Sequence, residues 1–249
     1  MQTERIAIIG AMDSEIASLL EAMEERREEA HWGLTFYLGR LEGRNIVLVK
    51  CGIGKVNAAR CTQILLDLYA PSALLHTGIA GGIGPGLKVG DAVIAQGLIQ
   101  HDFDVTAFGY ARGNICDRSQ RKEPSVFAAD VEIMDALENA SCQALGAERV
   151  HRGLVVTGDQ FISGGEKMGK ILHDFPRVQA CEMEGAAIGH AAVLGQVPFV
   201  VLRAISDNAN DDAKVDFPQF AKMAAQRSVQ LLKNALPDLQ QLLEKEKKV

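Results

Sequence analysis

Two glutamates, Glu182 and Glu184, lie in the segment CEMEGAAIGH among small and apolar side chains. A carboxylate in such surroundings is costly unless a partner compensates its charge. Two further acids follow apolar segments typical of strands: Glu15 comes after IIGAMDS, and Asp207 ends VVLRAISD. Because ligands collect at the carboxyl ends of strands in open α/β sheets, we predict that Glu15, Glu184 and Asp207 converge on one pocket.

Each acid also has a purely structural alternative. Glu15 fits the first turn of a helix, where the helix dipole favours an acid, and Asp207 fits a helix or turn cap. Glu184 fits one half of an ion pair with Arg203. Glu182 and Glu184 share a face if they lie on a strand, whereas on a helix they point about 200° apart. We predict the strand, because it places both acids at one polar site.

Three short motifs suggest phosphate or metal sites but lack the full pattern. GIGK at Gly52–Lys55 lacks the first glycine of a P-loop and has Val56 where Ser or Thr is needed. GIGPGL has Leu87 in place of the third glycine of a dinucleotide-binding loop. We expect both loops to give tight turns or close backbone approach to a ligand. HDFD (101–104) lacks a second histidine at ligand spacing, so we expect local hydrogen bonds there, and we expect His76 to be a core residue.

Apolar runs and helical spacing alternate along the chain. Strands are predicted for RIAIIG, ALLHTG, DAVIAQGLI, RGLVVTGD, QACEME and PFVVLRAISD, and a hairpin turning at 42–45 for TFYLGRLEGRNIVLVKCG. Helices are predicted after a cap at Asp13 or Ser14, at about 56–68, and near 130–145, 166–173, 185–194 and 217–236. The alternation predicts one α/β domain over residues 1–249, with a mixed sheet flanked by helices and a solvated helix end at 237–249. Residues 111–125 are polar and turn-rich, which is typical of a mobile loop.

Helical spacing also predicts which helix faces are buried. The first helix is predicted to bury Ile16, Leu19, Leu20 and Met23. The helix that follows GIGK is predicted to bury Val56, Ala59, Ile64, Leu65 and Leu68.

Composition excludes several classes of function. The net charge of −6 argues against nucleic-acid binding and against a basic membrane-binding surface. No apolar run reaches the roughly 18–20 residues that span a bilayer, and the N-terminal segment lacks the apolar core of a signal peptide. The five cysteines are scattered and form no CxxC motif, so we expect neither disulfides nor a zinc site. These features favour a reduced protein of the cytoplasm.

A longer set of motifs points to one family. IIGAMDSE, CGIGKVNAA, TGIAGGI, LKVGD, HDFDVTAFGY, TGDQFI, EMEGAAIGH and RAISD, in this order between Ile6 and Phe217, resemble the bacterial 5′-methylthioadenosine/S-adenosylhomocysteine nucleosidases. The resemblance implies a nucleoside phosphorylase-like α/β fold with a mixed sheet, and a homodimer. It also implies hydrolysis of the bond between adenine and ribose without a metal or cofactor.

The resemblance implies a role for each acid. Glu15 matches the glutamate that activates water, and Glu184 matches the one that binds the ribose hydroxyls beside the Met183 backbone. Asp207, aided by Ser206, matches the aspartate that protonates adenine at N7. This chemistry suits these residue types, because adenine is a poor leaving group as an anion and a positioned acid typically contributes about 10²–10⁴-fold. An apolar surrounding is expected to keep a proton on Asp207.

The resemblance also assigns the remaining walls of the site. Phe161 matches the residue that stacks on adenine, and Ile162 the one whose backbone binds the edge of the base. Val105 and Phe108 match residues that the neighbouring subunit contributes to the pocket for the 5′-substituent, with Phe217 on the near side. The other residues expected around the nucleoside are Met12, Ile53, Ile79, Ala80, Gly81, Glu182 and Arg203, with Glu182 as a supporting residue.

The chain departs from the family pattern twice, and other functions are compatible with the fold. Ile79 stands where the family often has serine in TGSAGG, and Cys116 falls near a position where some members have proline–glycine. A purine nucleoside phosphorylase needs arginine and serine around its phosphate, but His76 and Ile79 align with those positions. An aminodeoxyfutalosine nucleosidase would use the same acids. A non-catalytic nucleoside-binding protein would be expected to lack Glu15 or Asp207.

Overall fold

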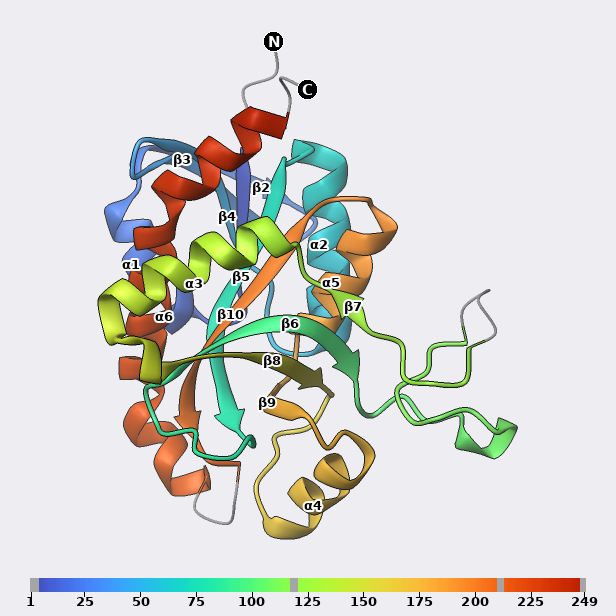
Figure 1. The fold of residues 1–249 in the computed structure, drawn as a ribbon. Coiled ribbons are helices and arrows are strands. Elements are labelled where there is room, and N and C mark those ends of the chain that lie inside the picture. Colours follow the sequence, from blue (N-terminus) through green and yellow to red (C-terminus); the bar gives the residue numbers. More distant parts are fainter. Residues whose placement is uncertain (1–4, 117–120, 210–212, 247–249) are drawn as a thin grey trace.

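Apolar strand segments and helices alternate in the computed structural model, which describes residues 5–116, 121–209 and 213–246 (Figure 1). The strands are β1 (Ile6–Gly10), β2 (Glu24–His31), β3 (Leu34–Leu41), β4 (Arg44–Lys50), β5 (Ala73–Gly82), β6 (Ala92–Gln100), β7 (Phe127–Ala128), β8 (Val150–Thr157), β9 (Val178–Glu182) and β10 (Phe199–Asp207). The helices are α1 (Asp13–Ala22), α2 (Lys55–Tyr69), α3 (Val131–Leu145), α4 (Gly165–Asp174), α5 (Gly185–Leu194) and α6 (Ala213–Glu246), with short 3-10 turns η1 (Thr106–Phe108) and η2 (Ala147–Arg149). The predicted mixed α/β architecture is confirmed.

The strands form one ten-stranded sheet in the order β10-β6-β8-β9-β5-β1-β4-β3-β2, with β7 beside β6. An additional β10–β5 pairing closes β10, β6, β8, β9 and β5 into a ring, while β1 to β4 extend from it. β1 pairs in parallel with β4 and β5, and β5 pairs in parallel with β10. The ends of β1, β5 and β10 therefore meet at one edge.

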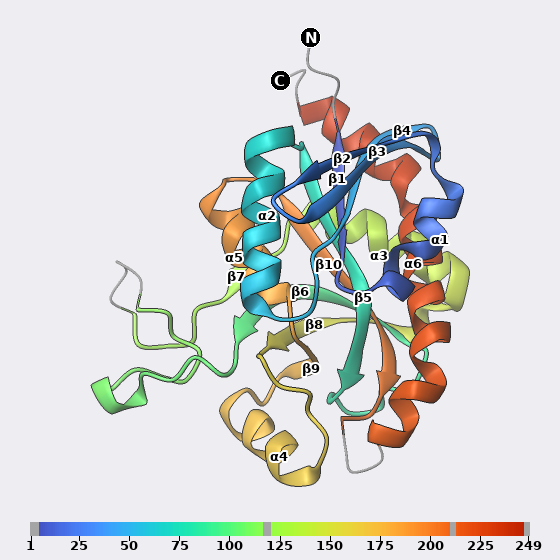
Figure 2. The same ribbon diagram turned by 180° about the vertical axis from the view of Figure 1, so that it is seen from behind.

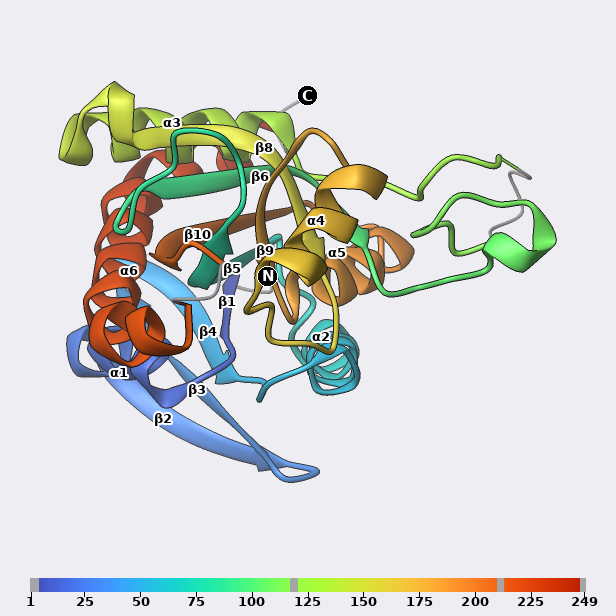
Figure 3. The same ribbon diagram turned by 90° about the horizontal axis from the view of Figure 1, so that it is seen from below.

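The central strands β1, β5 and β10 are buried on both faces because they are nearly continuous apolar runs. In β1, Ile6 and Ile8 belong to a cluster with residues of α1, α3 and α6, whereas Ala7 and Ile9 pack with residues of α2 and α5. Figures 1 and 2 show these two groups of helices on opposite sides of the sheet. Figure 3 shows α4 next to β9, and the residues that follow β6 extending away from the rest of the molecule.

Several element predictions need correction. β2 was not predicted, because its sequence EERREEAH is charged throughout and has no apolar alternation; it forms by antiparallel pairing with β3. The two-residue β7 was also missed. Helix α6 continues to Glu246 instead of ending near 236, so the predicted tail is largely helical, and 247–249 lie outside the described residues. In the predicted loop 111–125, Ala111 N–H donates to Lys122 O and Ser125 N–H to Gly113 O, while 117–120 lie outside the described residues.

The predicted buried face of α2 is partly correct: Leu65 is buried, and Ala59 and Ile64 are partly buried, but the other two predicted residues are not. Val56 is 78% exposed and Leu68 39% exposed. The buried residues are Ala58, Cys61, Thr62, Leu65 and Tyr69. Small and polar residues occupy this face because α2 packs against α5, and the Thr62 hydroxyl is satisfied by donating to Ala58 O (2.8 Å). In α1, by contrast, Ile16 and Leu19 are buried as predicted.

Two helical glycines test how tightly α5 packs against the sheet. A Cβ added to Gly189 would lie 2.7 Å from Leu98 Cδ1 and 3.0 Å from the Phe199 ring, whereas one added to Gly169 in α4 has nothing within 4 Å. We expect Gly189→Ala to lower the free energy of unfolding by about 1–3 kcal/mol. Gly169→Ala is the control and should raise it by about 0.5–1 kcal/mol. Urea unfolding measures both, and equal effects would contradict the tight contact at Gly189.

Candidate active site

A cavity of about 390 Å³ lies where β1, β5 and β10 end and where β9 leads into α5. We call it the acid-lined cavity; its lining residues are Ala11, Met12, Glu15, Ile53, Ile79, Ala80, Gly81, Phe161, Cys181, Glu182, Met183, Glu184, Ser206, Asp207 and Phe217. The structure thus brings together Glu15, Glu184 and Asp207, which the sequence places 23 or more positions apart. Ala11 and Cys181 were not predicted, because nothing in their residue types distinguishes them from core residues.

Glu15 is held by backbone donors from two strand ends. Its Oε2 accepts the N–H groups of Ala11 (2.7 Å) and Met12 (3.0 Å), and its Oε1 accepts that of Ile79 (3.1 Å). The side chain therefore satisfies the start of its own helix, and the predicted cap at Asp13 or Ser14 is wrong: the helix begins at Asp13 after Met12. Burial raises the pKa of Glu15, against the opposing effects of Arg203 and the three hydrogen bonds. A carboxylate with a raised pKa is a stronger base.

Glu182 and Glu184 do not share a strand. β9 ends at Glu182, and Glu184 (φ −132°, ψ −38°) immediately precedes α5. The chain turns here because Glu182 Oε2 accepts the N–H groups of Glu184 (3.0 Å) and Gly185 (2.7 Å). The predicted strand QACEME therefore extends two residues too far, although both carboxylates line the acid-lined cavity.

Arg203 pairs with Glu182 instead of Glu184. Its Nη2 lies 2.5 Å from Glu182 Oε2 and also contacts His76 Nε2, while His76 Nδ1 lies 2.9 Å from Ile9 O. Burial first, and Arg203 second, lower the pKa of His76 to about 3, so this histidine is neutral. His76 is therefore the satisfied core residue that the sequence predicted. Gly78 lies beside this pair, since a Cβ there would be 2.5 Å from Glu15 Oε1 and 2.7 Å from Arg203 Nη1.

His76, Glu182 and Glu184 form the one group of potential metal ligands within the described ranges, with ligand atoms within 4.8 Å of one another. Arg203 already donates to Glu182 and contacts His76. A metal cation would face this guanidinium at close range, so the donor set does not suit a metal.

The pKa of the Glu184 carboxyl group is strongly shifted. Burial raises its pKa to about 8, and the charge of Glu182 adds to this shift. Its Oε1 accepts the Gly54 N–H (2.9 Å). Gly54 has a φ of +96°, which favours glycine; its contact with Glu184 was not predicted, because the two residues are 130 positions apart in the sequence. The expected close backbone approach occurs, but here toward a carboxylate of the protein.

Asp207 is 2% exposed at the end of β10. Its Oδ1 accepts the Ala209 N–H (2.9 Å), and its Oδ2 lies 2.8 Å from Ser206 Oγ. Ser206 Oγ also lies 3.3 Å from Ala80 O. The Ser206 hydroxyl thus donates to the Asp207 carboxyl group, which is held through both of its oxygens.

Aromatic and aliphatic side chains complete the acid-lined cavity. Phe161 and Phe217 meet edge to face, with ring centroids 5.3 Å apart, and Phe161 is 40% exposed. Met12, Ile53 and Ile79 also line the cavity. The cavity thus combines apolar walls with four acids, Glu15, Glu182, Glu184 and Asp207.

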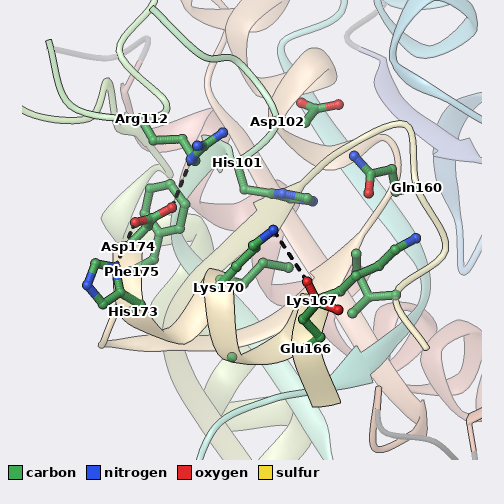
Figure 4. A pocket seen from close by; sticks show the side chains of 13 residues that line it. His101, Asp102, Arg112, Gln160, Glu166, Lys167, Lys170, His173, Asp174 and Phe175 are labelled. Carbon is green, nitrogen blue, oxygen red and sulfur yellow. Dashed lines mark hydrogen bonds and ion pairs between the residues drawn. The ribbon is translucent and has the colours of Figure 1, made fainter. Parts of the chain in front are cut away.

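Four predicted residues do not line the acid-lined cavity, and one of them, Arg203, is 1% exposed and pairs with Glu182. Val105 and Phe108 lie at η1 in the segment that extends from β6, and Phe108 is 78% exposed. Ile162 lines a second, larger cavity of about 660 Å³ between α4 and the residues after β6 (Figure 4). Some of its charged side chains pair with one another, as Arg112 does with Asp174 (2.8 Å). None of the three convergent acids lines this second cavity, so the acid-lined cavity is the candidate active site.

Glu184 should make stability depend on pH. The folded protein keeps the Glu184 proton up to about pH 8, whereas the unfolded chain loses it near the ordinary value of 4.5. The folded state thus binds more protons between these values, and the free energy of unfolding falls as pH rises through this window. Glu184→Gln has no carboxyl group that titrates at this position. Its free energy of unfolding, relative to that of wild type, should therefore increase by about 1–3 kcal/mol from pH 5 to pH 8.

Urea unfolding at both pH values measures this difference, with Glu166→Gln on exposed α4 as the control. A Glu184→Gln difference that is the same at pH 5 and pH 8 would contradict the buried, protonated state of Glu184.

Comparison with known proteins shows the family of this chain. The sequence profile of the phosphorylase superfamily matches residues 5–237. A 5′-methylthioadenosine/S-adenosylhomocysteine nucleosidase of Anoxybacillus flavithermus is 44% identical over 234 residues, which cover 93% of this chain and 98% of the relative. The crystal structure of such a nucleosidase from Neisseria meningitidis, in complex with methylthio-immucillin-A, has a TM-score of 0.88 at 41% identity and covers 94% of this chain and 98% of that one.

A futalosine hydrolase of Helicobacter pylori shares the fold at lower identity, with a TM-score of 0.87 at 29% identity over 95% of this chain and 98% of that one. The higher identity lies with the nucleosidases, and it extends over nearly the whole chain. The chain belongs to the phosphorylase superfamily and, within it, to the family of 5′-methylthioadenosine/S-adenosylhomocysteine nucleosidases.

Proposed function

We propose that this protein hydrolyses the N-glycosidic bond of 5′-methylthioadenosine and S-adenosylhomocysteine, releasing adenine and the 5-substituted ribose. The observation that carries the proposal is the convergence of Glu15, Glu184 and Asp207 in one cavity with apolar walls. Family membership supports it, since the relatives bear this name and the Neisseria meningitidis enzyme binds methylthio-immucillin-A.

In the proposed mechanism, Asp207 donates a proton to adenine N7 as the bond between N9 and C1′ breaks and its electron pair moves to the base. Positive charge then develops on the ribose, and Glu184 stabilises it. Glu15 takes a proton from water while the water oxygen bonds to C1′. Glu184 stabilises the positive charge in its ionised form, so with a pKa near 8 its proton must leave to solvent before the bond between N9 and C1′ breaks.

We assign adenine to the wall at Phe161, with the Ile162 backbone and Ser206 at the edge of the base, and the ribose to Met183 and Glu184. The 5′-substituent would lie near Met12, Ile53 and Phe217. Val105 and Phe108 lie outside this chain's own cavity and are exposed or half-buried. This placement suits the proposal that they complete the cavity of a second copy in a homodimer.

The site is poorly suited to binding a phosphate nucleophile. Arg203, a cation beside the acids, is engaged by Glu182, and the position expected to bind phosphate in a phosphorylase is occupied by neutral His76. A multiply charged anion would face carboxylates instead of charge-assisted donors. Hydrolysis is therefore favoured over phosphorolysis.

Product identification tests the proposal. The purified protein is incubated with methylthioadenosine with and without phosphate, and the sugar product is identified. We expect methylthioribose at the same rate under both conditions. Methylthioribose 1-phosphate formed only with phosphate would show a phosphorylase instead. Parallel kinetics with aminodeoxyfutalosine would separate the futalosine-type alternative, which the likeness to the Helicobacter pylori hydrolase keeps open.

Variants of the proposed acid, Asp207, and of the proposed base, Glu15, should differ in how their kcat depends on the leaving group. Asp207→Asn and Glu15→Gln are each expected to lower kcat on methylthioadenosine by about 10²–10⁴-fold. A nitrophenyl methylthioriboside has a leaving group that needs no protonation, so Asp207→Asn should regain most of its activity on it while Glu15→Gln stays slow. Steady-state kinetics measure both, and equal losses on both substrates would contradict the separate roles.

The buried thiol groups of the protein suit a reducing compartment. Burial raises the pKa of the Cys61 thiol to about 12 and also raises that of Cys181. Within the described residues, no helix is both long and apolar enough to cross a bilayer. We propose a cytoplasmic location on the basis of the thiols.

A further inference from the structure

Three loops near the acid-lined cavity meet in a closed ring of hydrogen bonds. Lys55 Nζ donates to Asp102 Oδ1 (2.6 Å), and Asp102 Oδ2 accepts the Asp159 N–H (2.9 Å). Asp159 Oδ1 in turn accepts the Lys55 N–H (2.8 Å). We call this the Lys55–Asp102–Asp159 ring; it joins the segments that follow β4, β6 and β8. Asp102 belongs to the HDFD motif, so the expectation of purely local hydrogen bonds there is wrong for this residue.

On one side of the ring, the contact between Lys55 and Asp159 fixes the backbone N–H group that binds Glu184. Lys55 and Gly54 are neighbours, and their N–H groups point to different acceptors: that of Lys55 to Asp159, and that of Gly54 to Glu184 (2.9 Å). A Cβ on Gly54 would lie 3.0 Å from Asp159 Oδ1, so the peptide and the aspartate are in close contact. A displacement of Asp159 would therefore move the donor that holds Glu184.

The other side of the ring leads to the wall proposed for adenine. Asp159 is two positions before Phe161, which lines the acid-lined cavity, and three before Ile162. Figure 4 shows Asp102 and Gln160 at the edge of the neighbouring cavity, on either side of this turn. The ring thus connects the ribose side of the site with its base side, although none of its members lines the acid-lined cavity.

Burial indicates that the ring orients groups more than it adds stability. The side chains of Lys55 and Asp102 are 17% and 15% exposed, so the pair is largely removed from water. Desolvation offsets much of the attraction in such a pair, which is therefore weak evidence for stability. The Lys55 hydrogen bond and the Asp159 N–H hold the pKa of Asp102 below its usual value even though burial, the largest single effect, acts to raise it.

We propose that Asp102 is a positioning residue for the hydrolysis: through Lys55 and Asp159 it fixes the Gly54 N–H on Glu184 and the Phe161 wall relative to each other. This inference rests on the proposed function. A small misplacement of groups that bind the reacting sugar can cost about 10²-fold in rate, so the effect of losing the ring should be visible in kinetics without unfolding the protein.

Asp102→Asn tests the ring. Asparagine has one acceptor oxygen, so it can serve Lys55 Nζ or the Asp159 N–H but not both. Asp135→Asn is the matched control: Asp135 also accepts one bond of 2.6 Å from a cation, Arg152, but on α3, and it lines neither cavity. We expect Asp102→Asn to lower kcat/KM on methylthioadenosine by about 10–100-fold. Asp135→Asn should stay within about twofold of wild type, and both variants should melt within a few degrees of each other.

A double-mutant cycle with Glu184→Gln shows whether the effect passes through the ribose carboxylate. If it does, Asp102→Asn should cost much less in the Glu184→Gln background than in wild type, because the group it positions is already lost. Equal kcat/KM for Asp102→Asn and Asp135→Asn, or fully additive losses in the cycle, would overturn the positioning role while leaving hydrolysis by the wild-type protein intact. A wild-type protein that releases no adenine would instead overturn the proposed function.

Discussion

The site depends on one buried cation among three carboxyl groups. Arg203 is 1% exposed, and its guanidinium is within reach of Glu182 at 2.5 Å, with Glu15 and Glu184 nearby. One guanidinium can neutralise only one carboxylate fully, and Glu182 is the carboxylate that contacts Arg203. The pKa of Glu182 is accordingly lowered by Arg203 and His76 although burial opposes this, whereas the pKa values of Glu15 and Glu184 are raised by burial. The unequal share of one charge thus shifts the pKa values of similar residues in opposite directions.

The fold supplies the rest of the arrangement through backbone donors. Glu15 takes N–H groups from the ends of β1 and β5, and Glu182 takes those that open α5. Glu184 takes the N–H of Gly54, which the ring through Asp102 holds in place. Because these donors belong to strand ends and helix starts, the carboxyl groups cannot shift without disturbing the sheet. Such preorganised positions are what stabilisation of a developing charge requires.

The sequence predicted those parts of the molecule that follow from local patterns. Apolar runs located the central strands, and the acids at their ends predicted the pocket, because the meeting of strand ends is a property of the sheet as a whole. β2 could not be found in this way, since EERREEAH forms a strand only because β3 lies beside it. The buried face of α2 was partly misjudged for a similar reason: the close contact with α5 selects Ala58 and Thr62 over Val56.

Side-chain partners were the least predictable feature. Glu182 and Glu184 were expected to share a strand, but the hydrogen bonds from Glu184 and Gly185 to Glu182 turn the chain between them. Arg203 was assigned to the wrong glutamate because spacing alone does not distinguish two acids that lie two positions apart. The ring through Asp102 was also missed, since its members come from three segments that only the folded sheet brings together.

The central claim is that Arg203 lowers the pKa of Glu182, whereas burial leaves the pKa of Glu184 raised to about 8. The most direct measurement is a pH titration of the carboxyl 13C shifts in protein labelled at glutamate Cδ, with Glu184→Gln and Glu182→Gln used for assignment. The account predicts one resonance that titrates near pH 8 and is absent from Glu184→Gln, and one assigned to Glu182 that stays ionised below its usual range. If every glutamate titrated close to its ordinary value, these opposite shifts would be contradicted.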